Sequence, residues 1–243
     1  MTRPKQSSPT PSSGWLGGTG RLGSPNEPNF NWLLAALVML ITGHALMPDD
    51  FLANVVLSVG VAIVGLATMP LLPRRGSLRF GQLALCAGAI LFVWVGPRIE
   101  NLLVAALTRI SLVGFFVSVA WLTIWHLVRA RRVTPETLVG AISGYLLLGI
   151  AFTMLFSMVE ILNPGALRLG IPADASLASK SSDLMYFSFI TLTTVGYGDM
   201  TPASDGARLL AMAEGITGQF YVAAVVARLI SLLVSSRREG PVQ

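Results

Sequence analysis

The stretch Thr194-Val195-Gly196-Tyr197-Gly198-Asp199 decides how the rest of this chain is interpreted. In an ordinary strand successive carbonyl groups point to opposite sides. For all of them to point toward one axis, the backbone has to switch hand at every second residue. Gly196 and Gly198 have the right spacing, because glycine adopts positive φ at little steric cost. The pattern predicts a loop whose carbonyl oxygens can hold a dehydrated cation.

These residues resemble the filter of the potassium-channel pore-loop superfamily, which reads Thr-Val-Gly-Tyr-Gly at this place. The resemblance covers roughly residues 134–236. It implies a passive potassium-selective channel and no enzyme, with K⁺ as the permeant ion and no cofactor. The implied K⁺ ligands are Thr194, Val195, Gly196, Tyr197 and Gly198, and the implied supporting residues are Thr193, Asp199, Tyr186 and Phe187.

Two of these supporting roles have open alternatives. Tyr186 and Phe187 either pack around the filter and hold its diameter or are apolar filler. In several relatives the residue matching Asp199 bonds to a carboxylate or an aromatic side chain on the pore helix. Because Ile190 stands four residues before Thr194, a pair of carboxyl groups cannot form here, and Asp199 is expected to be a solvated group that attracts cations.

The composition indicates a membrane protein. Of the 243 residues 53% are hydrophobic and 12% charged, whereas soluble domains carry about 25% charged residues. The fold class predicted is an all-α membrane protein with six transmembrane helices, a re-entrant pore helix and a selectivity-filter loop. The predicted spans are 31–47, 52–72, 79–96, 102–128, 136–162 and 205–234.

The chain divides into four predicted parts. Residues 1–30 are rich in Ser, Pro and Gly and are expected to be a disordered cytoplasmic segment. Residues 31–132 form a four-helix transmembrane domain, residues 133–236 the pore domain, and residues 237–243 a cytoplasmic tail. Within the pore domain Ser182 and Asp183 are suitable caps for a pore helix that begins at Leu184.

Basic residues alternate between loops in a way that predicts orientation. Arg74, Arg75 and Arg79 lie in the second loop and Arg237 and Arg238 in the tail. This places both termini in the cytoplasm and the protein in the cell (inner) membrane. Arg129, Arg131 and Arg132 are then expected to meet anionic lipid at the inner surface. Nucleic acid is not expected as a partner, because the basic residues flank apolar segments.

The chain carries a single filter loop, so a closed cage of carbonyls requires four copies around one axis. We therefore expect a homotetramer with cyclic symmetry.

The last predicted helix carries Glu214-Gly215-Ile216-Thr217-Gly218. We expect a gating hinge at Gly215 and close packing at Gly218. Glu214 either holds the back of the filter or pairs with a polar neighbour. The residues expected to line the ion path are Ile216, Phe220, Ala223, Ala224 and Ala227.

The fourth predicted span lacks the arginine ladder of a voltage sensor. Between residues 102 and 128 its one arginine is Arg109, whereas steep gating needs roughly 3–4 charges per subunit. A nonselective cation channel, and then a potassium transporter, are the alternative functions left open.

Overall fold

The protein is a helical bundle in the computed structural model, which describes residues 30–46, 50–72, 76–95, 101–130, 134–170 and 177–238. Its elements are α1 (Asn31–Leu46), α2 (Asp50–Thr68), the 3₁₀ turn η1 (Met69–Leu71), α3 (Gly76–Val95), α4 (Leu102–Arg129), α5 (Pro135–Leu162), β1 (Leu167–Arg168), α6 (Leu177–Leu192), β2 (Thr201–Pro202) and α7 (Asp205–Arg238).

Five of these helices are long and apolar enough to cross a membrane: α2, α3, α4, α5 and α7. The predicted spans agree with them to within a few residues at most ends. Helix α1 has 16 residues, about 24 Å at 1.5 Å per residue, which is less than the ~30 Å of a hydrocarbon core. The sixth span therefore stays a prediction.

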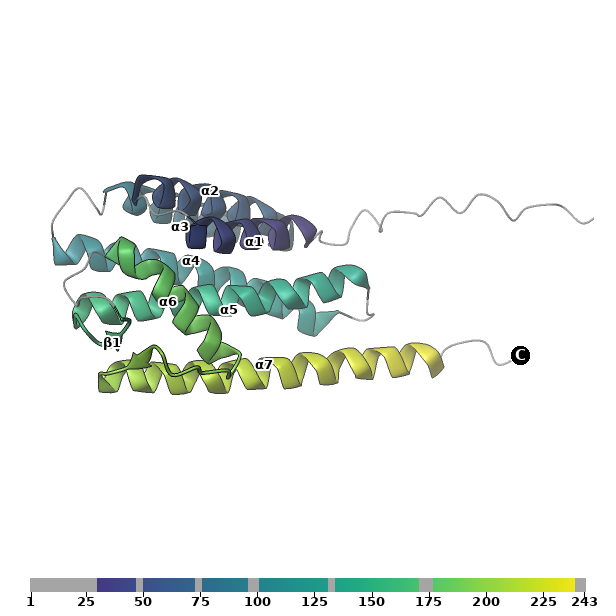
Figure 1. The fold of residues 1–243 in the computed structure, drawn as a ribbon. Coiled ribbons are helices and arrows are strands. Elements are labelled where there is room, and N and C mark those ends of the chain that lie inside the picture. The colour runs from purple at the N-terminus through teal and green to yellow at the C-terminus, as the bar shows by residue number, and fades with distance from the viewer. Residues whose placement is uncertain are drawn as a thin grey trace, which may run out of the picture.

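The helices lie nearly parallel, except for α6 (Figure 1). Helices α1, α2 and α3 lie on one side of α4 and α5, and α7 lies on the other side. The main hydrophobic core fills the space between the first helices and the α4–α5 pair, where Leu37, Val64, Phe115 and Leu147 are fully buried. Helix α6 crosses obliquely between α5 and α7 and ends near the middle of α7.

The predicted disordered segment 1–30 lies outside the described residues except for Phe30. Phe30, the last residue of that segment, is buried in the core. Its ring lies against Gly140 of α5, where an added Cβ would come within 3.1 Å of it. The predicted tail 237–243 lies outside the described part of the chain apart from the last turn of α7.

The pore helix begins earlier than its predicted caps. Helix α6 starts at Leu177, so Ser182 and Asp183 lie inside it. The reason is a contact that local sequence does not reveal. Lys180, in the first turns of α6, donates to the buried carboxylate of Glu160 on α5 at 2.9 Å, and the two side chains are 4% and 1% exposed.

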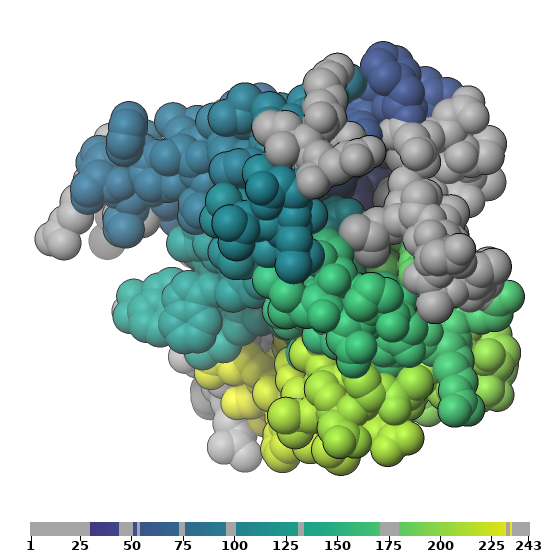
Figure 2. Space-filling view, turned by 90° about the vertical axis from the view of Figure 1, so that its left-hand side faces the viewer, coloured from purple at the N-terminus to yellow at the C-terminus, as the bar shows by residue number. Residues whose placement is uncertain are grey.

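Glu160 holds together three parts of the chain at this end of the bundle. Its second oxygen accepts from the backbone N–H of Leu167 at 3.2 Å, and Gly165 N–H donates to the first at 2.9 Å. Strand β1 in turn pairs with β2, which follows the filter loop, with Leu167 opposite Pro202. Figure 2 shows this end of the molecule, with the green α6 region beside the yellow-green start of α7.

We predict that Lys180→Met destabilises the protein, because it leaves the buried Glu160 carboxylate without its counter-charge. The expected loss is about 3–5 kcal/mol in free energy of unfolding, measured as a lower thermal midpoint of the purified protein. The matched control is Arg208→Gln, because the Arg208–Asp205 pair is exposed and should contribute no more than about 1 kcal/mol. Equal midpoints for the two variants would contradict the assignment.

Candidate functional site

The loop that follows α6 shows the alternation of backbone hand that its sequence predicts. Thr194, Gly196 and Gly198 have φ of 58°, 52° and 82°, so every second residue is left-handed. Thr194 is the one non-glycine residue with positive φ in the described part of the chain. The two glycines occupy positions that L-residues with a Cβ adopt at a cost of roughly 1–2 kcal/mol.

The amides of the loop point back toward the end of α6. Val195 N–H and Gly196 N–H both donate to the carbonyl of Ile190, at 2.9 and 3.2 Å, and Thr194 N–H donates to Thr191 at 2.9 Å. In a trans peptide the N–H and the preceding C=O point in opposite directions, and no described peptide is cis. The carbonyls of Thr193, Thr194 and Val195 therefore point away from α6.

Side chains brace both ends of the loop. At the outer end the Tyr186 hydroxyl donates to Asp199 Oδ2 at 2.8 Å, and Met200 N–H donates to Oδ1 at 3.0 Å. The first of these bonds raises the pKa of Tyr186, because it favours the protonated hydroxyl. Asp199 is thus bonded to an aromatic residue of the pore helix and is also exposed, and its role in attracting cations stays a prediction.

At the inner end of the loop Gln219 of α7 donates to Thr194 Oγ1 at 3.1 Å. Gln219 was not among the residues expected from the sequence. Phe220 and Ala224, which were expected to line the ion path, line a pocket between α7, α5 and α4, and Ile216 lines the same pocket. Thr193 bonds back into α6, its hydroxyl donating to Phe189 at 2.7 Å.

Phe187 is buried between α6 and α5. Its ring packs edge-on against Phe156 of α5 with the centroids 5.0 Å apart. Its expected role in packing around the filter stays a prediction. Tyr186 is the member of the pair that reaches the loop region.

A polar cluster behind α6 joins three helices. The Ser188 hydroxyl lies 2.8 Å from the carbonyl of Gly149 on α5 and 2.5 Å from Glu214 Oε1 on α7. Glu214 is completely buried, and this contact agrees with both alternatives left open for it. Tyr145 of α5 donates to the carbonyl of Leu192, the last residue of α6, at 3.1 Å. Ser188 and Tyr145 were not singled out from the sequence, since isolated hydroxyl groups in apolar runs are common.

The two glycines of α7 differ in their surroundings. A Cβ on Gly218 would collide with the carbonyl oxygen of Leu192, whereas the nearest atom to a Cβ on Gly215 is the Thr191 carbonyl at 3.9 Å. Close packing at Gly218 is therefore confirmed. Helix α7 runs unbroken from Asp205 to Arg238, and the hinge at Gly215 stays a prediction. The described part of the chain places Ile216, Ala223 and Ala227 on exposed positions of α7.

The arrangement of outer helix α5, re-entrant helix α6, left-right alternating loop and inner helix α7 defines a pore-loop ion-channel module. A family model described as "Ion channel" matches residues 144–235. Protein LctB of Bacillus caldotenax is 33% identical over 102 residues, 41% of this chain and 75% of that protein. The chain belongs to the potassium-channel pore-loop superfamily.

Two plant proteins are similar over shorter stretches. Two pore potassium channel b of Oryza sativa subsp. japonica is 41% identical over 59 residues, 24% of this chain and 17% of that protein. Two-pore potassium channel 1 of Arabidopsis thaliana is 42% identical over 55 residues, 23% of this chain and 15% of that protein. The chain thus spans less than a fifth of the length of these plant relatives. No solved structure matches. The similarities point to a channel rather than to an enzyme.

We predict that Gly218→Ala and Gly215→Ala separate packing from bending. Gly218→Ala should push Leu192 and the end of α6 outward, lowering both the thermal midpoint of the protein and its ion flux. Gly215→Ala has room for its methyl group and gains up to roughly 1 kcal/mol of helix propensity, so its thermal midpoint should not fall. A hinge at Gly215 then shows as altered channel opening in single-channel recordings at unchanged stability. Equal destabilisation by both variants is the result that contradicts this difference.

Proposed function

We propose that this chain is the subunit of a homotetrameric channel that conducts K⁺ passively and selectively across the cell membrane. The observation that carries the proposal is the loop backbone, with left-handed φ at residues 194, 196 and 198. Its amides are bonded to the end of α6. The carbonyl oxygens on the opposite side are then available to replace the water around a potassium ion.

Four copies are proposed because one loop supplies only one wall of such a cage. The exposure of the loop supports this. In the single chain Tyr197 is 73% exposed and Val195 52%. Large apolar side chains of α7 are also exposed, including Leu209 at 65% and Met212 at 60%. Apolar surface of this extent on the inner helix favours contact with further copies around a shared axis.

The C-terminal end of α6 favours a nearby cation electrostatically. Its C-terminal turn ends at Leu192, directly before the loop, and the negative end of a helix dipole favours positive charge. We place Ile216, Gln219, Ala223 and Ala227 along the ion path below the loop. Alanines at the inner positions leave a narrow apolar constriction that can close by dewetting.

The orientation follows the basic loops. We propose six spans, with α1 as a short first span, both termini in the cytoplasm, and Arg129, Arg131 and Arg132 at the inner surface of the cell membrane. Arg131 and Arg132 lie outside the described residues. A nonselective cation channel is the alternative, and the bond between Tyr186 and Asp199 argues for selectivity, because it holds the outer end of the loop to the pore helix.

We predict that Gly196→Ala abolishes K⁺ flux and leaves membrane insertion intact. The φ of 52° at this position strains any residue with a Cβ, and a change of hand there turns a carbonyl away from the axis. Flux is measured in liposomes with imposed K⁺ gradients, and selectivity as the shift in reversal potential when Na⁺ replaces K⁺. The control is Gly206→Ala in the first turn of α7, where an added Cβ meets nothing within 4 Å. Retained flux in Gly196→Ala, or equal permeation of the two ions by the unaltered protein, contradicts the proposal.

We predict weak voltage dependence. Arg109 is the one arginine of α4 before Arg129 at its end, and one charge crossing 100 mV supplies only about 2.3 kcal/mol. Conductance of the purified protein in planar bilayers should change by no more than about fiftyfold per 100 mV, which is the limit for one charge that crosses the whole field. A steep conductance–voltage relation that disappears in Arg109→Gln would contradict the absence of a sensor in the usual form.

A further inference from the structure

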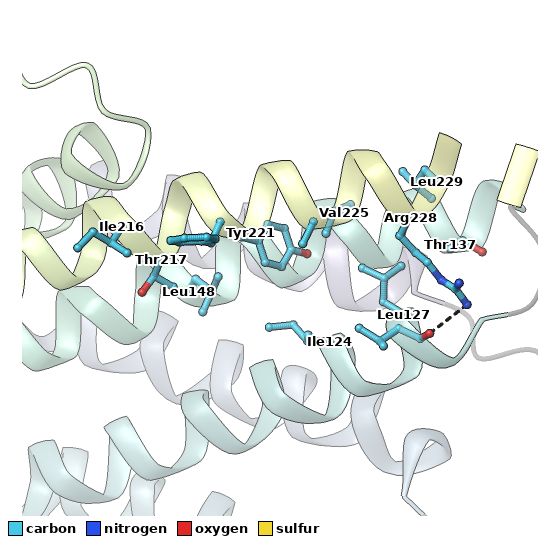
Figure 3. Close-up of a pocket in the computed structure, with 13 residues that line it drawn as sticks. Ile124, Leu127, Thr137, Leu148, Ile216, Thr217, Tyr221, Val225, Arg228 and Leu229 are labelled. Carbon is cyan, nitrogen blue, oxygen red and sulfur yellow. Dashed lines mark hydrogen bonds between the residues drawn. The ribbon is translucent and has the colours of Figure 1, made fainter. Parts of the chain in front are cut away.

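A pocket of about 420 Å³ lies between α7, α5 and the second half of α4. Figure 3 shows its walls, with Ile216, Tyr221 and Val225 on α7, Leu148 on α5 and Ile124 on α4. The volume is within the range of about 300–1,000 Å³ that is typical of ligand sites. Ile216 is the one lining residue that is also placed along the proposed ion path, and no residue of the loop lines the pocket.

The walls of the pocket suit a hydrocarbon ligand. Most lining side chains are apolar, and the polar groups among them already have partners within the protein. The Thr217 hydroxyl donates to Ala213 at 2.7 Å, Thr137 takes part in the capping box at the start of α5, and the Tyr221 hydroxyl donates to Ala141 at 2.6 Å. A ligand in the body of the pocket therefore needs no polar atoms.

The end of the pocket near the C-terminus of α4 is basic. Arg228 reaches from α7 to the carbonyls of Val128 and Ala130, at 3.3 and 3.0 Å (Figure 3). Arg129, between these two residues, lies with its guanidinium 3.9 Å from the centre of the Trp125 ring. Ion pairs among the described residues join Lys180 to Glu160 and Arg208 to Asp205, so neither Arg228 nor Arg129 has a carboxylate partner there.

The length and direction of the pocket match one leaflet of a bilayer. Its α7 residues run from Ile216 to Leu229, which is thirteen steps of ~1.5 Å, or about 20 Å. One half of the hydrocarbon core measures about 15 Å. The apolar end lies beside Gly215, at the depth of the loop, and the basic end lies where α4 and α7 approach the proposed inner surface.

We propose that an acyl chain of an anionic phospholipid from the cytoplasmic leaflet occupies this pocket, with its phosphate held by Arg228. The apolar walls select a hydrocarbon chain, and the guanidinium group of Arg228 selects a negative headgroup. The chain would lie against the segment of α7 that follows Gly215 and thereby link lipid composition to the bending of the inner helix. The site rests on the proposed membrane orientation and does not depend on K⁺ conduction.

The experiment measures lipid binding to the purified full-length protein by native mass spectrometry. Phosphatidylglycerol and phosphatidylcholine with identical acyl chains are compared, and glycerol phosphate tests whether a headgroup alone competes. We expect phosphatidylglycerol to be retained preferentially and glycerol phosphate to compete weakly. Arg228→Gln should reduce the preference for phosphatidylglycerol about fivefold, the contribution of one basic residue at an anionic surface.

A second variant tests the acyl chain. Val128 lines the pocket at its edge and is 58% exposed, so Val128→Trp should fill the entrance and lower the binding of both lipids. The matched controls are Val117→Trp, at a 47% exposed position of α4 outside the pocket, and Arg208→Gln at the other end of α7. Both controls should bind lipid as the unaltered protein does.

Three results would overturn the proposal. One is equal binding of the two lipids by the unaltered protein. Another is full competition by glycerol phosphate, which would indicate a phosphate site without a tail. The third is unchanged lipid binding in Val128→Trp together with dissociation of the oligomer, which would assign the pocket to a second copy of the chain. Because binding is the readout, a protein that binds the lipid but conducts no K⁺ would contradict the proposed function alone.

Discussion

The structure depends on how the irregular backbone of residues 193–198 satisfies its hydrogen bonds at membrane depth. Lipid cannot bond to free amides, so such backbone persists there only where protein or water accepts from it. The last turn of a helix has carbonyls without intrahelical partners, and here the carbonyl of Ile190 receives two amides of the loop while Thr191 receives a third. The free carbonyls at the end of the pore helix and the free amides of the loop therefore satisfy each other's hydrogen bonds. In the proposed function, the carbonyls on the other side of the loop are the ones that contact the ion.

Because the loop is bonded to the end of α6, the position of the loop depends on the position of α6. A shift of α6 would displace the acceptors of three hydrogen bonds from loop amides. This helix of sixteen residues therefore needs contacts with its neighbours that hold it in place. Contacts at both ends and in the middle achieve this. Lys180 ties its first turns to Glu160, Ser188 lies between the carbonyl of Gly149 and Glu214, and Tyr145 bonds to the carbonyl of its last residue. Gly218 then allows α7 to lie directly against that same carbonyl.

The parts of the site that sequence reasoning predicted are those with local causes. The glycine spacing of the loop follows from the φ values that each position needs, and the contrast between Gly215 and Gly218 follows from helix packing. Contacts between distant segments were not predictable in this way. Ser182 and Asp183 have the composition of caps, yet a salt bridge to a residue twenty positions away extends α6 beyond them. Gln219 was not predicted, because its bond to Thr194 joins residues 25 positions apart, and the expectation that Phe220 lines the ion path stays a prediction. Glu160, an acidic residue in an apolar run, had the same signal as Glu214 and could have been identified by the same criterion.

The first four helices are joined to α7 by a hydrogen-bonded contact at the C-terminus of α4, and this contact involves no voltage-sensing arginines. Much of the core lies between α1, α2, α4 and α5, so α4 moves with the rest of that domain. At its C-terminus α4 presents the carbonyls of Val128 and Ala130 to Arg228 of α7, where the negative end of the helix dipole strengthens the contact. Helix α7 is therefore held beside the loop by Gly218 and Glu214, at Tyr221 by the bond to the carbonyl of Ala141 on α5, and near its C-terminal end by Arg228. None of the side chains from 219 to 228 is fully buried in the single chain. Helix α4 is thus joined to α7 directly through Arg228 and to the end of α6 through α5, whose Gly149 and Tyr145 bond to Ser188 and to the carbonyl of Leu192.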